Sequence, residues 1–120
     1  MRLGLLDPYD FSLLVRFLSR WRHPALDRIT AGAYRRVLRL SNGSVLIQAH
    51  MTGPASRTLE VTVLHATTAP DAAELEKRIR HVLAIDRSAA PFWEWAQSHP
   101  VLGPVLSPVA GLPITRTETL

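Results

Sequence analysis

Apolar and polar residues alternate along neighbouring runs in the middle of the chain, and this pattern predicts an antiparallel sheet. The first run extends from Tyr34 to Leu40, and the second begins after a Ser-Asn-Gly-Ser turn at positions 41–44. Asn-Gly between alternating apolar residues is a strong hairpin signal, because both central residues of a type I′ turn need positive φ. A third run follows positions 53–56 and ends near His65. Residues 34–65 therefore predict a three-stranded meander.

The third run also predicts which face of the sheet is buried. Leu59, Val61 and Val63 alternate there with Glu60 and Thr62. Successive side chains of a strand point to opposite faces, so the three apolar residues are expected inside and the two polar ones in solvent. The sheet then needs a cover on one face only.

An amphipathic helix near the N-terminus is the first predicted cover. Asp7 is interpreted as its N-cap and Pro8 as its first residue, with Asp10 adding negative charge at the positive end of the helix dipole. One helical face carries Phe11, Leu14, Val15 and Leu18. The helix is expected to end before Pro24, since the residue before a proline is pushed out of the α region. Residues 3–6 are interpreted as an edge strand and residues 25–32 as a connector.

A second helix is predicted after the sheet. Thr68 is interpreted as its N-cap, with Asp71 at the third helical position in an arrangement close to a capping box. An apolar stripe follows, made of Leu75, Ile79, Val82 and Leu83. Two amphipathic helices therefore face one sheet.

A short aromatic helix is predicted from Pro91 to Ser98. Phe92, Trp93 and Trp95 could stack on nucleic-acid bases, which requires exposed rings beside positive charge. The nearest charge is Glu94, which favours a role in the core or in a domain contact. The proline-rich stretch 99–120 is interpreted as a linker, and residues 115–120 as the opening of a third helix.

The charge pattern has two interpretations. The net charge is +4, carried almost wholly by arginine with Lys77 as the one lysine, which indicates either a polyanionic partner or the codon usage of a GC-rich genome. Arg35, Arg36 and Arg39 on the first strand of the meander are possible DNA contacts; alternatively they lie on a solvated face with Glu60 as a cross-strand partner. No apolar run is long enough for a signal peptide or a membrane span, and there is no cysteine, so we expect a cytoplasmic protein.

No candidate catalytic, metal or cofactor site is visible. His50 and His65 lie near strand ends, but a zinc site needs three or four converging ligands, so both are interpreted as ordinary polar residues. Asp7 and Asp10 are explained as helix-start residues, and no nucleophile elbow or phosphate-binding glycine loop occurs. By its residues alone the chain is an α+β domain without a visible active site.

The C-terminal third resembles a known family. Residues 82–86 (Val-Leu-Ala-Ile-Asp), Phe92, the segment 99–103 (His-Pro-Val-Leu-Gly) and residues 111–113 (Gly-Leu-Pro) are similar to the domain junction of 3-methyladenine DNA glycosylase II type enzymes, in the helix-hairpin-helix glycosylase superfamily. Residues 117–120 are similar to the start of the helix that leads into the family's glycine-glutamine-glutamine motif. Pro113 stands where a basic residue is common in that family.

The resemblance implies a fold and a function. The fold would be a TATA-binding-protein-like antiparallel sheet covered on one face by two helices, with an α+β domain at 1–87 and, at 88–120, a linker and the start of a helical catalytic domain. The parent enzyme would be a monomeric, monofunctional N-glycosylase of the bacterial nucleoid that flips and excises alkylated bases from double-stranded DNA. The catalytic aspartate and the helix-hairpin-helix of this enzyme would follow Leu120, so the present chain is expected to be inactive alone. In the parent enzyme it would pack against the helical catalytic domain. The alternative is a stand-alone interaction module that binds nucleic acid weakly or dimerises through its sheet.

Overall fold

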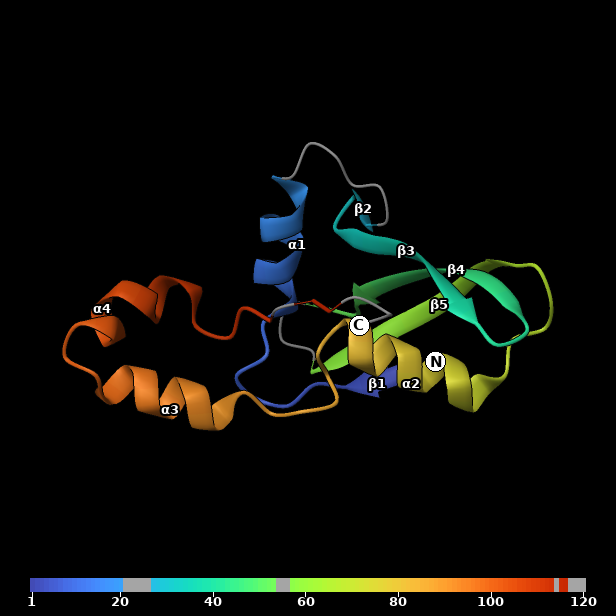
Figure 1. The fold of residues 1–120 in the computed structure, drawn as a ribbon. Helices are drawn as coiled ribbons and strands as arrows, with labels where there is room; N and C mark the ends of the chain where they lie inside the picture. The colour runs from blue at the N-terminus through green and yellow to red at the C-terminus, as the bar shows by residue number, and fades with distance from the viewer. Residues whose placement is uncertain (21–26, 54–56, 114, 117–120) are drawn as a thin grey trace.

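A five-stranded antiparallel sheet forms the centre of the computed structural model, which describes residues 1–20, 27–53, 57–113 and 115–116 (Figure 1). The spatial order is β1-β5-β4-β3-β2. The strands are β1 (Arg2–Gly4), β2 (Asp27–Thr30), β3 (Ala33–Leu40), β4 (Gly43–Met51) and β5 (Thr58–Ala66). The predicted meander is β3-β4-β5, and the predicted edge strand is β1. The interpretation of residues 25–32 as a connector was wrong for 27–30, which pair with β3 as the other edge strand.

The turn between β3 and β4 differs from its prediction. Leu40 pairs with Gly43, so the two loop residues are Ser41 and Asn42 and neither has positive φ. The predicted type I′ turn centred on Asn-Gly is therefore wrong, although the hairpin itself is present. Two consecutive positive φ angles occur instead between β2 and β3, at Ala31 (50°) and Gly32 (76°), as the type I′ turn requires.

Alternation along the strands separates an inner face from an outer one. Tyr34, Leu38, Ile47 and Leu59 point into one hydrophobic core and are almost fully buried. Val63 was expected there too, but it is 40% exposed. It lies beside a bulge where Ile47 pairs with Val63 while Leu46 pairs with His65, and a bulge interrupts the regular pleat.

Helix α1 (Phe11–Ser19) contributes to this core. Its N-cap is Asp10, whose carboxylate accepts a hydrogen bond from the Leu13 amide at 3.1 Å, so the predicted start at Asp7 lay three residues too early. Asp7 instead forms an ion pair with Arg57 at 2.9 Å. The predicted apolar face is confirmed: Phe11 and Leu14 are buried, and Val15 and Leu18 pack against the core. The expected end before Pro24 lies outside the described residues.

Helix α2 (Ala72–Val82) also packs on this core through its predicted stripe, all four residues of which are buried. Its N-cap is Asp71, which accepts from the Glu74 amide at 2.8 Å, and not Thr68. The Thr68 hydroxyl donates to the Asn42 carbonyl instead. The Ser41 hydroxyl and amide both donate to the Glu74 carboxylate and hold the pKa of Glu74 below its usual value. The β3–β4 turn is thereby tied to the start of α2.

The C-terminus of α2 closes with a Schellman motif. The Ile85 amide donates to the Arg80 carbonyl and the Ala84 amide to the His81 carbonyl. Ala84 adopts a φ of 57° at the position where glycine is usual. The chain is thus turned sharply away from α2 without a glycine.

Two further helices and a turn form an extension that we call the arm, residues 90–109. It consists of α3 (Ala90–Ser98), which confirms the predicted aromatic helix, α4 (Leu102–Leu106) and the 3-10 helix η1 (Ser107–Val109). The predicted linker is thus partly helical, and its expected final helix lies mostly outside the described residues. Figure 1 shows the arm projecting from the sheet and its two covering helices, which we call the body. Within the described residues, no helix is long and apolar enough to cross a membrane.

Candidate functional site

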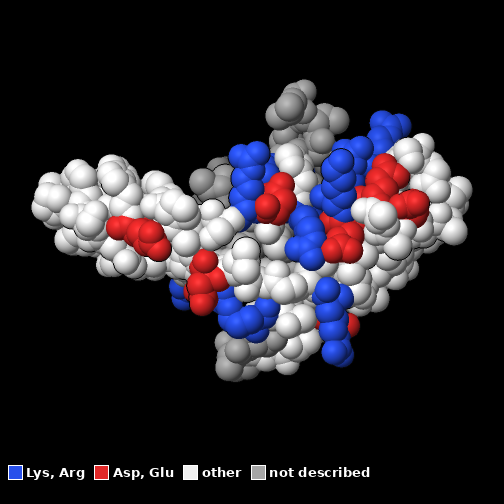
Figure 2. Space-filling model, turned by 90° about the horizontal axis from the view of Figure 1, so that it is seen from below, with Lys and Arg blue, Asp and Glu red and all other residues white. Residues whose placement is uncertain are grey.

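Five of the large apolar side chains that are exposed among the described residues lie in the arm. Residues 90–109 contain one charged side chain, Glu94. Figure 2 shows basic and acidic side chains interspersed over the body, whereas the arm is almost uncharged on this face. The exposed large apolar side chains of the arm are Phe92, Trp95, Val101, Val105 and Val109. Apolar surfaces of this kind are typical of sites that contact another protein surface, a membrane or a ligand.

The three aromatic residues of α3 divide between the inside and the outside of the arm. Trp93 is buried, and its ring packs edge-on against Phe92 with centroids 5.1 Å apart. Phe92 and Trp95 are about half exposed. Trp95 also lies 5.6 Å from the His99 ring. The exposed rings thus cluster in an arm that has no Lys or Arg of its own, with Arg87 and Arg116 beside Phe92 at the edge of the arm.

A cleft of about 550 Å³ separates the arm from the body. Its apolar lining includes Leu6 and Tyr9 from the body, and Phe92, Leu106 and Leu112 from the arm and the segment after it. Arg87 and Arg116 lie at the same cleft. The cleft extends the apolar surface of the arm toward the body.

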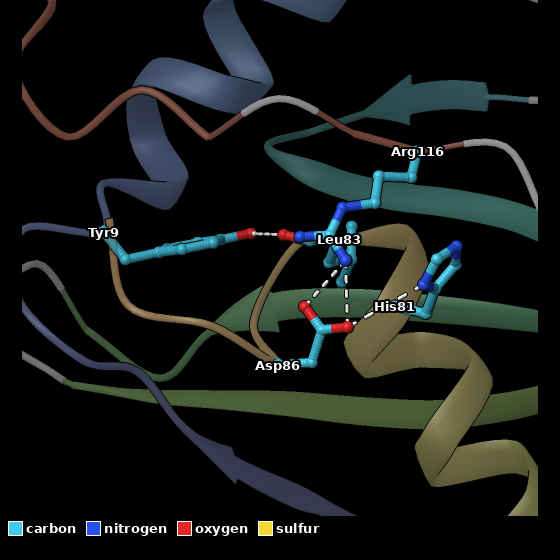
Figure 3. Close-up of polar contacts among 5 residues, drawn as sticks. All are labelled: Tyr9, His81, Leu83, Asp86 and Arg116. Atoms are coloured by element: carbon cyan, nitrogen blue, oxygen red, sulfur yellow. Dashed lines mark hydrogen bonds and ion pairs between the residues drawn. The ribbon is translucent and has the colours of Figure 1, made fainter. Parts of the chain in front are cut away.

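A set of polar contacts fastens the chain on both sides of the arm to the body. We call it the seam; it consists of Tyr9, Leu83, Asp86, Gly111 and Arg116. The Tyr9 hydroxyl donates to the Leu83 carbonyl at 2.7 Å, and Arg116 binds both oxygens of Asp86 at 2.9 Å (Figure 3). Burial raises the pKa of the Tyr9 phenol well above its usual value. The tyrosine therefore remains a neutral hydrogen-bond donor.

Backbone contacts complete the seam. The Asp10 amide donates to the Gly111 carbonyl at 2.8 Å, and the Arg116 amide donates to the Val82 carbonyl at 2.9 Å. Gly111 has a φ of 84°, and a Cβ at this position would collide with the Pro8 carbonyl oxygen. The seam fixes where the chain returns after the arm.

The three arginines singled out in the sequence do not share a face. Arg36 lies on the inner face and is only 5% exposed, with its Nη1 3.5 Å from the Tyr34 hydroxyl. Arg35 and Arg39 lie on the outer face, where Arg35 Nε donates to the Gln48 side chain at 2.7 Å. Glu60 is not their cross-strand partner, because β4 lies between β3 and β5; it pairs with Arg2 at 3.1 Å instead. A DNA contact remains a prediction for the two outer arginines, whereas the burial of Arg36 speaks against a surface role for it.

The two histidines of the meander lie far apart in the strand register. His50 is opposite Glu60, and His65 is opposite Leu46 beyond the bulge. Among the described residues, no group of three or more His, Asp or Glu side chains is placed to hold a metal ion. The pair therefore offers no metal centre in the part of the chain that the structure describes.

Comparisons with known proteins agree with this architecture. The family model of the AlkA N-terminal domain matches residues 1–118. A solved structure, the 3-methyladenine DNA-glycosylase from Archaeoglobus fulgidus, superposes with a TM-score of 0.72 at 18% identity. The match covers 92% of this chain and 36% of that protein, so the chain spans about a third of its length. No curated protein matches the chain.

The two matches bear on different conclusions. At 18% identity the structural match shows the fold, and it confirms the TATA-binding-protein-like α+β architecture expected from the sequence. The family match extends over nearly the whole chain and confirms the resemblance based on residues 82–120. The chain therefore belongs to the AlkA N-terminal domain family.

Proposed function

We propose that this chain serves as the accessory, non-catalytic N-terminal domain of a DNA glycosylase that removes alkylated bases. Family membership supports this role, because the matched family is the N-terminal part of such an enzyme. The similar A. fulgidus protein is a 3-methyladenine DNA-glycosylase about two thirds of which has no counterpart here. The work of this chain is then to support a helical catalytic domain that binds double-stranded DNA in the bacterial nucleoid.

The observation that carries the proposal is the exposed apolar surface of the arm. Val101 and Val105 are each 64% exposed, and Trp95 is 53% exposed. Burying such side chains against a partner contributes roughly 25 cal/mol per Å² of apolar surface. The arm lies within residues 88–120, which would form the linker and the start of a helical domain. The rest of that domain would pack against the arm in the same polypeptide. Residues 1–87 would form the α+β domain of a monomeric enzyme.

The excision reaction tests the non-catalytic part of the proposal. We expect the purified 120-residue chain to release no free base from DNA treated with a methylating agent. Released 3-methyladenine is measured by liquid chromatography, with a 3-methyladenine DNA-glycosylase as the positive control. Release above the protein-free background would contradict the proposal.

Binding of a hydrophobic dye tests the role of the arm. A variant with Trp95→Ser, Val101→Ser and Val105→Ser is expected to lose most of the dye fluorescence of the unmodified chain, because its exposed apolar surface is removed. Val37→Ser is the matched control, since Val37 is 50% exposed on the outer face of the sheet. An equal loss in the control would show that the arm is not the main apolar surface.

A second function is favoured by the outer face of the sheet, where Arg28 and Arg35 are directly opposite each other in β2 and β3 and Arg39 follows on the same face. A stand-alone module of this kind would bind DNA electrostatically or dimerise through the sheet. Fluorescence anisotropy of a labelled duplex would then show an affinity that falls with salt, because neutralised phosphates release counterions. Absence of binding at low salt would eliminate the DNA form of this function.

A further inference from the structure

A hollow with unusual charge lies at the end of the sheet, next to α1. Its volume is about 790 Å³, within the range of small-ligand sites. We call it the basic hollow. It is lined by α1, by the β2–β3 turn at 30–33 and by neighbouring positions of β3 and β4, and its polar lining side chains include Ser12, Arg16, Arg35, Gln48 and His50.

The two arginines of the basic hollow have no carboxylate beside them among the described residues that line it. No Asp or Glu is among the described residues that line it. Neither Arg16 nor Arg35 forms an ion pair with a described carboxylate. Arg28 is directly opposite Arg35 across the β2–β3 pair, and like charges in that position repel. An anion bound at Arg35 would weaken this repulsion.

The hydrogen-bonding groups of the hollow are only partly used. Arg35 Nε donates a hydrogen bond to the Gln48 side chain, and this bond holds the guanidinium in place. The two terminal nitrogens of Arg35 bond to no described residue. His50 Nδ1 is buried without a hydrogen-bond partner among the described residues. Nδ1 is closed to solvent, so the ring enters the lining of the hollow through its other atoms.

A phosphate group matches these features. The planar guanidinium presents paired N–H groups that fit phosphate oxygens, and a hydroxyl and an imidazole add further hydrogen-bonding atoms. The hollow is much larger than a phosphate ion, and Phe11, Val15 and Met51 give it an apolar part. We propose that the basic hollow binds the phosphate group of a nucleotide, either free or within a nucleic-acid strand. This goes beyond the accessory role and does not depend on it.

Histidine NMR of the 120-residue chain tests the proposal. The side-chain resonance of His50 is assigned with His50→Gln, and the chain is titrated separately with a nucleoside monophosphate, inorganic phosphate and a short DNA duplex. We expect a saturable shift of the His50 signal with the monophosphate, at lower concentration than with inorganic phosphate. A shift with the duplex alone would also support the site and would identify a backbone phosphate as its ligand.

Charge variants separate the hollow from general electrostatic attraction. Arg16→Gln and Arg35→Gln are each expected to weaken binding about tenfold or more, the usual loss of a charged hydrogen bond. Arg87→Gln and Lys77→Gln remove the same charge outside the hollow and should change binding less than twofold, with circular dichroism confirming that all four variants fold. No His50 shift with any probe, or equal losses in all four variants, would overturn the proposal.

Discussion

The body and the arm bury their apolar side chains to very different extents. In the body, the inner face of the sheet and the facing stripes of α1 and α2 form one core. In the arm, Trp93 and Ala96 are the buried residues of 90–109, while Phe92, Trp95, Val101, Val105 and Val109 remain exposed. The body therefore holds its fold by its own packing, whereas the arm buries little of its own and depends on the seam for its attachment. The following predictions test this difference, from the largest expected effect to the smallest.

Truncation of a body side chain should cost far more stability than truncation of an arm side chain. Leu38→Ala removes a fully buried side chain and is expected to lower the free energy of unfolding by about 2–5 kcal/mol. Val105→Ala, in the exposed surface of the arm, should change it by less than about 0.5 kcal/mol. Urea unfolding followed by circular dichroism measures both. Similar losses would mean that the arm is packed as tightly as the body.

Gly111→Ala tests the seam that joins the two regions. The substitution puts a Cβ against the Pro8 carbonyl at a positive φ and is expected to cost about 2–4 kcal/mol. Gly4→Ala is the control, because its Cβ would meet nothing within 4 Å. A loss no larger than that of the control would show that the contact between Gly111 and Pro8 is absent in solution.

Tyr9→Phe removes one side-chain hydrogen bond of the seam. It leaves the Leu83 carbonyl without this donor, and we expect the free energy of unfolding, measured in urea, to fall by about 1–3 kcal/mol.

The pKa of Tyr9 also predicts how stability depends on pH. It is raised above 10.0 in the folded chain, so the unfolded chain loses this proton more readily. The stabilising contribution of Tyr9 is therefore complete below about pH 10 and declines as the pH rises further. The same alkaline decline in the Tyr9→Phe variant would refute this assignment.

Ala84→Gly should raise stability at the end of α2. Glycine adopts positive φ without the steric penalty of a Cβ, but it also raises the backbone entropy of the unfolded chain. The net effect is an expected rise of about 0.5–1 kcal/mol in the free energy of unfolding. Ala73→Gly, within α2, should have the opposite sign. Thermal unfolding of the two variants measures the contrast. A lower melting temperature for Ala84→Gly would contradict the left-handed conformation of Ala84.

Hydrophobic periodicity predicted the body well and its boundaries less well. The stripes of α1 and α2 and the strands of the meander follow from long apolar repeats. Strand β2 was missed because its four residues, Asp27–Thr30, are too few to show an alternating pattern. Its first two residues, Asp27 and Arg28, also have the opposite charges of a local ion pair. The N-caps were placed three residues early at both helices, since Asp7 and Thr68 are as suitable for capping in sequence as Asp10 and Asp71.

The candidate sites depended on contacts distant in sequence. The inward position of Arg36 could have been read from the alternation it shares with Tyr34 and Leu38, but its charge suggested a surface role. The basic hollow could not be predicted, because it joins Arg16 of α1 to Arg35 and His50 of the sheet. The apolar character of the arm could be predicted from the sequence, because residues 90–109 contain a single charged side chain. The seam could not, because it joins Tyr9 and Gly111, which lie about a hundred residues apart.

The seam also constrains the order in which the chain can mature during synthesis. The Asp10 amide, at the start of α1, finds its acceptor in Gly111, and the Val82 carbonyl, at the end of α2, finds its donor in Arg116. A ribosome produces residues 10 and 82 well before these partners. The start of α1 and the end of α2 therefore keep open hydrogen-bonding positions until the whole arm has emerged.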